Sequence, residues 1–136
     1  MRVRTVFAVL VRFTRSTTTV RWLCFRVAVG NGSSYGGGMR ICPSASIVDG
    51  TLDVTVVDEI SVGQLLRLFP KVYAGTHMRH PQAHAYRGQS VRLEFLDGLV
   101  PPIFADGEPM SSALEGRSCA VSVRPRALQL LAPPLP

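Results

Sequence analysis

The chain has 136 residues, of which 46% are hydrophobic and 18% charged, and its formal net charge is +6 at pH 7. This is the length and composition of one globular domain, and the longest apolar run, residues 6–11, is far too short for the ~20 residues of a membrane-spanning helix. The positive charge is almost all arginine, dispersed among apolar residues without the aromatic platform of a nucleic-acid interface, so we expect no nucleic-acid binding.

The predicted elements are mostly strands, because valine-rich runs alternate with glycine and proline turns. Residues 4–13 fit a helix or a strand, and their periodicity does not decide between the two. Strands are predicted where β-branched or apolar residues run between turn residues, at 17–22, 23–29, 39–41, 52–57, 90–96 and 118–125. The sum is a mainly β domain.

One helix is predicted after the strand at 52–57. Ser61 is a suitable N-cap, and an apolar face follows at helical spacing. That face would consist of Val62, Leu65, Leu66 and Phe69, over about two turns or slightly more. Pro81 should end any helical continuation.

The glycine-rich loop is a candidate phosphate cradle, since residues 27–54 hold six glycines. A Walker-type loop needs Lys and Ser or Thr after its last glycine, whereas Met39 and Arg40 follow here, and the spacing fits no dinucleotide fingerprint either. We therefore favour a structural role for Gly36-Gly37-Gly38, where the backbone would pass close to another strand or a ligand.

Histidine and cysteine patterns do not predict a metal centre. His77, His80 and His84 could ligate zinc, but Pro81 interrupts the helix that would align them and no cysteine or carboxylate lies nearby. A surface loop is the expectation there. The three cysteines are far apart, which excludes a metal knuckle and favours a reducing cytoplasm over a disulfide framework.

Two acidic turns are stronger candidates for a functional site than the histidines and cysteines. Asp49-Gly50 and Asp106-Gly107-Glu108 each place carboxylates next to a strand. Turn chemistry explains an Asp-Gly pair by itself. However, carboxylates and backbone carbonyls are also the oxygen ligands that Mg²⁺ prefers, and a carboxylate can accept a hydroxyl proton.

Four blocks in order carry a family resemblance: VAVGNGSSYGGGMRICPSASIVDGTLDVTVV, AGTH, FADGEP and SVRPRALQLLAP. Together they cover roughly residues 26–133, and they resemble the C-terminal domain of the diacylglycerol kinase and sphingosine kinase family of lipid kinases, above all its bacterial branch. The resemblance implies an antiparallel β-sandwich with one or two short helices at 23–133. Residues 1–22 would be a remnant of a preceding segment, and 134–136 a tail.

The resemblance also implies roles for particular residues. The family transfers the γ-phosphoryl group of ATP to a lipid hydroxyl such as that of diacylglycerol. By its pattern, the side chain of Asp49 and the backbone carbonyls of Ser46 and Thr51 would hold a structural Mg²⁺. Glu108, with Asp106 as its rival, would accept the proton of the lipid hydroxyl. The remaining candidates, facing the cleft that binds the nucleotide, are Asn31 and Gly32.

The chain departs from the family because nothing in it matches the Gly-Gly-Asp-Gly-Thr motif of the nucleotide-binding lobe. It resembles half of a kinase: a truncated or mis-called reading frame, a remnant, or one subunit of a split enzyme, inactive alone. Its expected partners are a lipid substrate and a kinase lobe or a second copy. The alternative is a non-catalytic sandwich that binds a protein or an anionic membrane surface. A cytoplasmic location, with peripheral membrane contact through the arginines, suits both readings.

Overall fold

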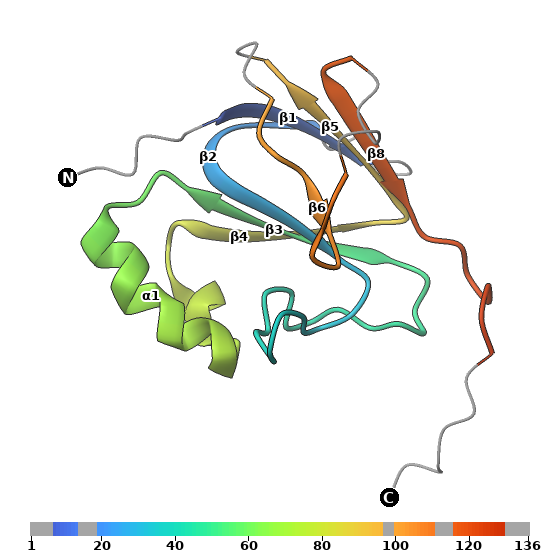
Figure 1. Cartoon of the computed structure of the whole chain (residues 1–136), viewed down its shortest axis with the longest axis horizontal. Coiled ribbons are helices and arrows are strands. Elements are labelled where there is room, and N and C mark those ends of the chain that lie inside the picture. The colour runs from blue at the N-terminus through green and yellow to red at the C-terminus, as the bar shows by residue number, and fades with distance from the viewer. Residues whose placement is uncertain (1–6, 14–18, 97–99, 111–115, 130–136) are drawn as a thin grey trace, which may run out of the picture.

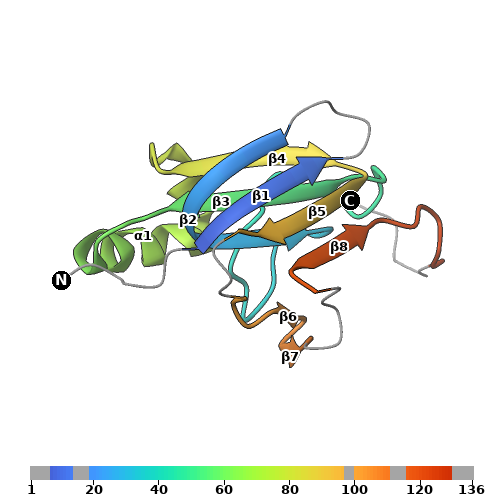
Figure 2. The ribbon, with the colours of Figure 1, turned by 90° about the horizontal axis from the view of Figure 1, so that it is seen from above.

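The computed structural model describes residues 7–13, 19–96, 100–110 and 116–129. Six antiparallel strands form one sheet in the order β4-β3-β2-β1-β5-β8, and a two-stranded ribbon, β6-β7, lies beside it (Figures 1 and 2). The strands are β1 (Phe7–Phe13), β2 (Thr19–Gly30), β3 (Leu52–Asp58), β4 (Ala83–Gly88), β5 (Ser90–Phe95), β6 (Phe104–Ala105), β7 (Glu108–Pro109) and β8 (Ser118–Ser122). The helices are α1 (Val62–Ala74) and the 3₁₀ helix η1 (Thr76–Arg79). The predicted mainly β, antiparallel class is confirmed.

The N-terminal part of the sheet differs from the prediction in one respect. The strands predicted at 17–22 and 23–29 are one continuous strand, β2, whose first half pairs with β1 and whose second half pairs with β3. An irregularity between Cys24 and Arg26 separates the two halves. Because β1 also pairs with β5, its backbone is hydrogen-bonded on both sides, which favours a strand in the segment whose periodicity was ambiguous.

The predicted domain boundaries, at residues 22 and 133, stay a prediction.

The sheet closes over a hydrophobic core. The buried cluster combines alternate residues of β3, namely Leu52, Val54 and Val56, with alternate residues of β5. Since β2 and β1 separate these two strands in the sheet, they meet only because the sheet curls over, as the bend of β2 in Figure 1 shows. Ile103, which precedes the β6-β7 ribbon, packs against the same cluster. The ribbon is therefore anchored at its base.

Helix α1 begins as predicted and then departs from the prediction. Ser61 is the N-cap, and its hydroxyl and the Gln64 side chain form a reciprocal capping box. The helix runs for 13 residues with Pro70 inside it, rather than two turns, and ends at Gly75 in the left-handed conformation.

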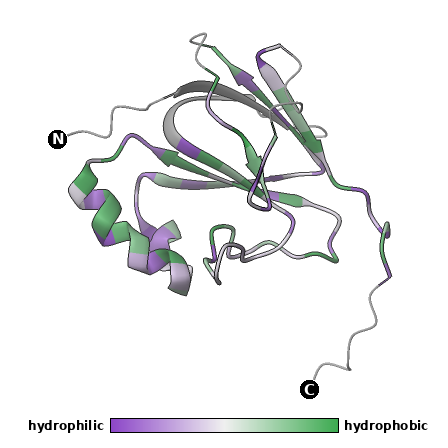
Figure 3. Ribbon diagram, viewed as in Figure 1, coloured by the Kyte–Doolittle hydropathy of each residue, from purple (hydrophilic) through white to green (hydrophobic). Residues whose placement is uncertain are grey.

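The face of α1 that packs against the protein is only partly the predicted one: of the four predicted residues, Val62 and Leu65 are partly buried. Leu68 and Val72 are buried, whereas Leu66 and Phe69 are 68% and 52% exposed. Apolar residues lie on more than one side of this helix, as its mixed colouring in Figure 3 shows, so its spacing alone did not define the inward face.

Two further predictions concern strands. The strand predicted at 39–41 is wrong: Met39 makes an isolated bridge with Tyr35 across a glycine turn. Strand β4 was not predicted, because AHAYRG has little of the alternation that marks a strand. It pairs with β3 along its whole length and lies at the edge of the sheet. The strands predicted at 90–96 and 118–125 are confirmed as β5 and β8, although β8 ends earlier, at Ser122.

Candidate functional site

The Asp49 turn leads directly into β3. Asp49 Oδ1 accepts hydrogen bonds from the backbone N–H of Thr51 at 2.9 Å and from its hydroxyl at 2.8 Å. Gly50 between them has a φ of +69°, which favours glycine. The two hydrogen bonds from Thr51, and then the positive charge of Arg87, lower the pKa of the Asp49 carboxyl. Asp49 is therefore an anion at neutral pH, held by its own turn.

Arg87 on β4 joins this turn to the sheet. Its Nη2 donates to Asp49 Oδ2 at 2.8 Å and to the Ser44 carbonyl at 3.3 Å, while its Nε donates to Asp53 Oδ2 at 3.2 Å. Asp53 is buried in β3, opposite Arg87 in the register, and its Oδ1 accepts a 2.7 Å hydrogen bond from the Ser44 hydroxyl. The guanidinium thus bridges two carboxylates that come from different segments.

Sequence reasoning missed three members of this network: Ser44, Asp53 and Arg87. The signal for Asp53 was present, since a carboxylate within an apolar strand needs a partner when the strand is buried. The partner itself could not be read from the sequence, because β4 was not predicted and its register with β3 decides that Arg87 lies opposite Asp53.

The donor chemistry of the Asp49 turn suits a hard divalent cation. It offers an ionised carboxylate in a loop whose backbone carbonyls can complete an oxygen ligand set. Within the described part of the chain, no group of three or more His, Cys, Asp or Glu side chains converges in the way a metal centre requires. A cation at Asp49 would therefore depend on backbone carbonyls, as the family pattern implies for Ser46 and Thr51. It would also meet Arg87, which already contacts Oδ2.

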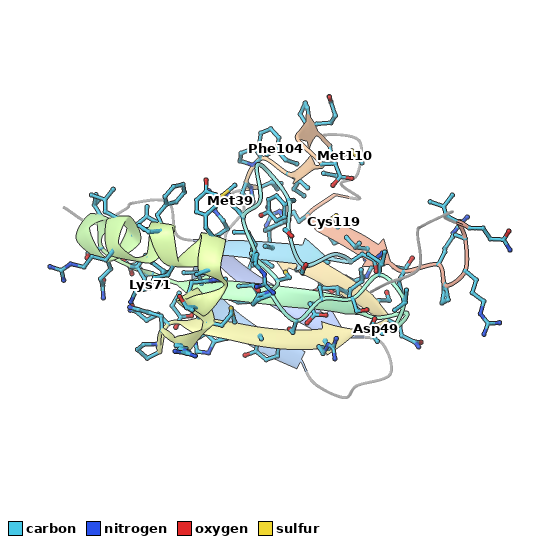
Figure 4. The ribbon with its side chains drawn as sticks, turned by 90° about the horizontal axis from the view of Figure 1, so that it is seen from below. Met39, Asp49, Lys71, Phe104, Met110 and Cys119 are labelled. Carbon is cyan, nitrogen blue, oxygen red and sulfur yellow. The ribbon has the colours of Figure 1, made fainter. Side chains whose placement is uncertain are left out.

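The second acidic turn lies at the tip of the β6-β7 ribbon. Asp106 and Gly107 have φ values of +50° and +90°, as a two-residue hairpin turn requires, and Ala105 pairs with Glu108. The predicted turn is confirmed. Asp106 and Glu108 are both exposed. Figure 4 shows Phe104 and Met110 of this ribbon well apart from Asp49, so the structure does not bring the two acidic turns together.

The glycine loop has a different structural role from the one predicted. Gly36, Gly37 and Gly38 all have positive φ and form the tight turn between Tyr35 and Met39, with open space around Gly37 and Gly38. Gly37 and Gly38 are needed for their backbone conformation alone, whereas an added Cβ at Gly36 would also lie 2.9 Å from the end of the Met39 side chain. A close approach is also found at Gly30, where an added Cβ would lie 3.1 Å from Cys42 Sγ.

Asn31 and Gly32 follow at the exit of β2. Asn31 is exposed, and an added Cβ at Gly32 would lie 3.7 Å from the Ile47 side chain, two residues before Asp49. The structure therefore places these two residues beside the loop that carries the Asp49 turn. Of the predicted site residues, the nucleotide candidates and the metal candidates lie near one another, and the hairpin carboxylates lie elsewhere.

The three histidines do not converge. His77 is buried, with Nε2 3.1 Å from the Ile41 carbonyl, and burial lowers the pKa of its imidazole. His84 Nε2 lies 2.9 Å from Asp58 Oδ2, and His80 Nδ1 accepts from the Gln82 backbone. Each ring has its own partner within the protein. The surface-loop expectation is wrong for His77, which is buried in η1, and for His84, which lies on β4.

A cavity of about 310 Å³ lies beside the Arg87 network. Its lining includes Cys42, Ser44, Asp53, Thr55 and Met78. Burial raises the pKa of the Cys42 thiol, whose sulfur lies 3.6 Å from the Thr55 hydroxyl. The thiol is therefore neutral and poorly reactive, and the cavity offers no activated nucleophile.

An exposed apolar stripe runs along α1. Leu66, Phe69 and Tyr73 lie on one side of the helix and are 68%, 52% and 48% exposed. The rings of Phe69 and Tyr73 meet edge to face. Arg67 and Lys71 are exposed beside them, and α1 carries no acidic residue. Within the described residues, no helix has the length and apolar character needed to cross a membrane.

Comparison with known proteins identifies the class to which this fold and these motifs belong. The family described as the YegS C-terminal NAD kinase beta sandwich-like domain matches residues 3–132, nearly the whole chain. The chain belongs to this family. It is thus a member of the lipid kinase C-terminal domains, as the sequence blocks predicted.

Individual relatives agree with that assignment. A diacylglycerol kinase of Mycobacterium tuberculosis is 39% identical over 104 residues, which are 76% of this chain and 31% of the relative. A YegS-like lipid kinase of Stenotrophomonas maltophilia is 35% identical over 86 residues, or 63% of this chain and 28% of the relative. The chain therefore spans about a third of the length of the curated relatives it matches.

Solved structures support the fold. Two structures from Bacillus anthracis that carry the name diacylglycerol kinase match with TM-scores of 0.64 and 0.57 at 19% and 17% identity. The matches cover 90% and 93% of this chain, and 38% and 46% of those chains. At this identity, the likeness concerns the fold alone.

Proposed function

We propose that this chain is the C-terminal domain of an ATP-dependent lipid kinase that phosphorylates a lipid hydroxyl such as that of diacylglycerol. The observation that carries the proposal is the family match over residues 3–132, together with 39% identity to a named diacylglycerol kinase. The nucleotide-binding lobe would lie outside the matched region, since that region is only 31% of the relative. The chain alone is expected to transfer no phosphate.

In this proposal, Glu108 accepts the proton of the lipid hydroxyl, with Asp106 as the rival. Both carboxylates are exposed at the ribbon tip, and within the described residues neither has a hydrogen-bond or ion-pair partner. A carboxylate in that position is free to meet a hydroxyl presented from outside the domain. The base role requires this freedom, because the base must reach within hydrogen-bond distance of the proton it takes.

The Asp49 side chain and the backbone carbonyls of Ser46 and Thr51 would hold Mg²⁺. The ionised state of Asp49 and its rigid turn support this assignment. The ion would be structural: it would hold the loop that carries the Asp49 turn, which lies apart from the hairpin carboxylates (Figure 4). Asn31 and Gly32, which lie beside the same loop, would be the nucleotide-facing residues of this domain.

The proposal is tested in a chimera. The part of the Mycobacterium tuberculosis diacylglycerol kinase that matches this chain is replaced by this chain, and phosphate transfer from ATP to diacylglycerol is measured with Mg²⁺. We expect activity, and a loss of about 10²-fold or more in Glu108→Gln, since general bases typically contribute this much. Asp106→Asn separates the two candidates: it should retain most activity if Glu108 is the base, and the reverse result would make Asp106 the base. A folded chimera that binds ATP yet transfers no phosphate would refute the proposal.

A second candidate function is contact with an anionic membrane surface through α1. The specific observation is the exposed stripe of Leu66, Phe69 and Tyr73 flanked by Arg67 and Lys71. Apolar side chains that enter the headgroup region, with basic residues beside them, are typical of interfacial helices. This contact would suit a lipid substrate and would place the domain at the membrane periphery.

Vesicle sedimentation tests this contact. The double variant Leu66→Ser and Phe69→Ser should bind vesicles with anionic lipid at least several-fold more weakly than the original chain. Leu128→Ser is the control, because Leu128 is 82% exposed but lies far along the chain from α1. Equal loss in both variants, or no binding by any of them, would exclude α1 as the contact.

A further inference from the structure

Arg87 has more contacts than the neutralisation of one buried carboxylate requires. Its Nε alone pairs with Asp53, and the Ser44 hydroxyl completes the partners of that carboxylate. Nη2 of the same guanidinium reaches out of the sheet to Asp49 Oδ2 at 2.8 Å and to the Ser44 carbonyl. The Arg87 side chain thus ties the loop of residues 44–53 to β4, because it contacts the loop at both ends, Ser44 and Asp53, and in the middle, at Asp49.

The position that Nη2 occupies is one that a divalent cation at Asp49 would need. Mg²⁺ binds carboxylate oxygens at about 2.0–2.1 Å and demands near-octahedral geometry. Asp49 Oδ1 already accepts two hydrogen bonds from Thr51, which leaves Oδ2 as the more accessible oxygen, and Arg87 is on it. An arginine cannot give up its proton in a protein, so the guanidinium charge is permanent and repels a second cation.

We propose that Arg87 is the resident cation of the Asp49 turn and competes with a divalent ion for the carboxylate. This inference rests on the proposed Mg²⁺ role of Asp49. When an ion binds, Nη2 leaves Asp49 while Nε keeps its contact with Asp53, so the side chain remains anchored to β3. Two consequences follow: the turn is folded without an ion, and the affinity of the chain for the ion is set by Arg87 as well as by the ligands.

The experiment is a titration of the full chain with Mn²⁺ as a probe for Mg²⁺, followed by electron paramagnetic resonance of the free ion. We expect Arg87→Gln to bind Mn²⁺ at least about tenfold more tightly than the original chain, because the competing charge is gone. Asp49→Asn should abolish this binding in either background. Arg92→Gln is the matched control: Arg92 is an exposed strand arginine on β5 that donates to Ser118, and its loss should leave the affinity unchanged.

Arg87→Lys keeps the test decisive if Arg87→Gln does not fold. A lysine retains the charge but has one ammonium in place of the two-nitrogen fork, so it cannot hold both carboxylates in the same way. Its Mn²⁺ affinity should lie between those of the original chain and Arg87→Gln. The thermal midpoint gives a second measurement: millimolar MgCl₂ should raise it more in Arg87→Gln than in the original chain.

The outcomes of the Mn²⁺ titration separate the competition by Arg87 from the proposed Mg²⁺ role of Asp49. Binding that depends on Asp49 but is equal with and without Arg87 would overturn the competition and leave the Mg²⁺ role of Asp49 intact. The absence of any Asp49-dependent binding, in every variant, would overturn both. Tighter binding in Arg87→Gln that Asp49→Asn does not remove would place the ion elsewhere and would also overturn the competition.

Discussion

The two faces of strand β3 are both buried, one through apolar packing and the other through polar contacts. Leu52, Val54 and Val56 face the core and pack against β5. Asp53 and Thr55, which alternate with them, are just as buried but lie in a polar layer. There, Asp53 binds Arg87 and Ser44, and the Thr55 hydroxyl donates to the Ile41 carbonyl at 2.9 Å.

The difference between the faces shows how this domain separates stability from chemistry. The apolar face needs only volume and shape, and any aliphatic residue of the right size serves it. The polar face needs particular partners, because a buried polar group without a hydrogen bond is costly. Its partners come from the loop of residues 40–46 and from β4, and they extend to the Asp49 turn at the surface. The candidate site is thus built on the polar face.

The largest expected effect is on the core face. Leu52→Ala should lower the free energy of unfolding by about 2–5 kcal/mol, because it removes a fully packed side chain and leaves a cavity. Urea denaturation measures this loss. Leu66→Ala, on the exposed stripe of α1, is the control and should change the free energy of unfolding by less than about 0.5 kcal/mol. A smaller loss at Leu52 than at Leu66 would mean that β3 does not line the core.

A smaller loss is expected on the polar face. Asp53→Ala should cost about 1–3 kcal/mol in the free energy of unfolding, less than the loss of a buried pair usually costs, because the side chain of its partner Arg87 is 51% exposed and can be solvated. Arg87→Ala in the same assay should cost more, since it leaves the buried carboxylate unpaired. If Arg87→Ala proved harmless, the ion pair would not stabilise the fold.

The pH dependence of stability gives a further test of the polar layer, because His77 shares the Ile41 carbonyl with Thr55. The folded protein lowers the pKa of buried His77, so below about pH 6.5 the unfolded chain binds the proton more readily. Stability should therefore be complete above that pH and fall as the pH decreases through it, by at most about 1.4 kcal/mol per pH unit for one proton. His77→Gln should flatten this slope in urea unfolding curves recorded from pH 5 to 8. His80→Gln, the control, should keep it.

The smallest effect is expected outside both faces, at the start of α1. Ser61→Ala removes the N-cap hydroxyl that accepts from the Gln64 N–H, at a cost of about 1 kcal/mol in the free energy of unfolding. Ser61→Asp keeps a capping oxygen and should restore most of that loss. An equal loss in both variants, measured by thermal unfolding, would show that the hydroxyl acts through something other than the cap.

Several features could be predicted from the sequence because they depend on neighbours in the chain. The alternation of residues 52–57 predicted β3, Ser61 predicted the helix start, and Asp106-Gly107 predicted a turn that proves to be a hairpin. The ordered motif blocks predicted the family. In each case, the physical cause lies within a few residues: a side-chain period, a capping hydroxyl or a backbone conformation that glycine tolerates.

The tertiary structure decided the rest, because the remaining questions concern partners that are far apart in the sequence. Only the pairing of β4 with β3 places Arg87 opposite Asp53 and within reach of Asp49. Only the packing of α1 selects Leu68 and Val72 for burial over Leu66 and Phe69. The sequence by itself determined the strand at 52–57, the start of α1 and the turns at the two acidic sites. Which charge neutralises each carboxylate depends on register and curvature, which arise only when the sheet closes.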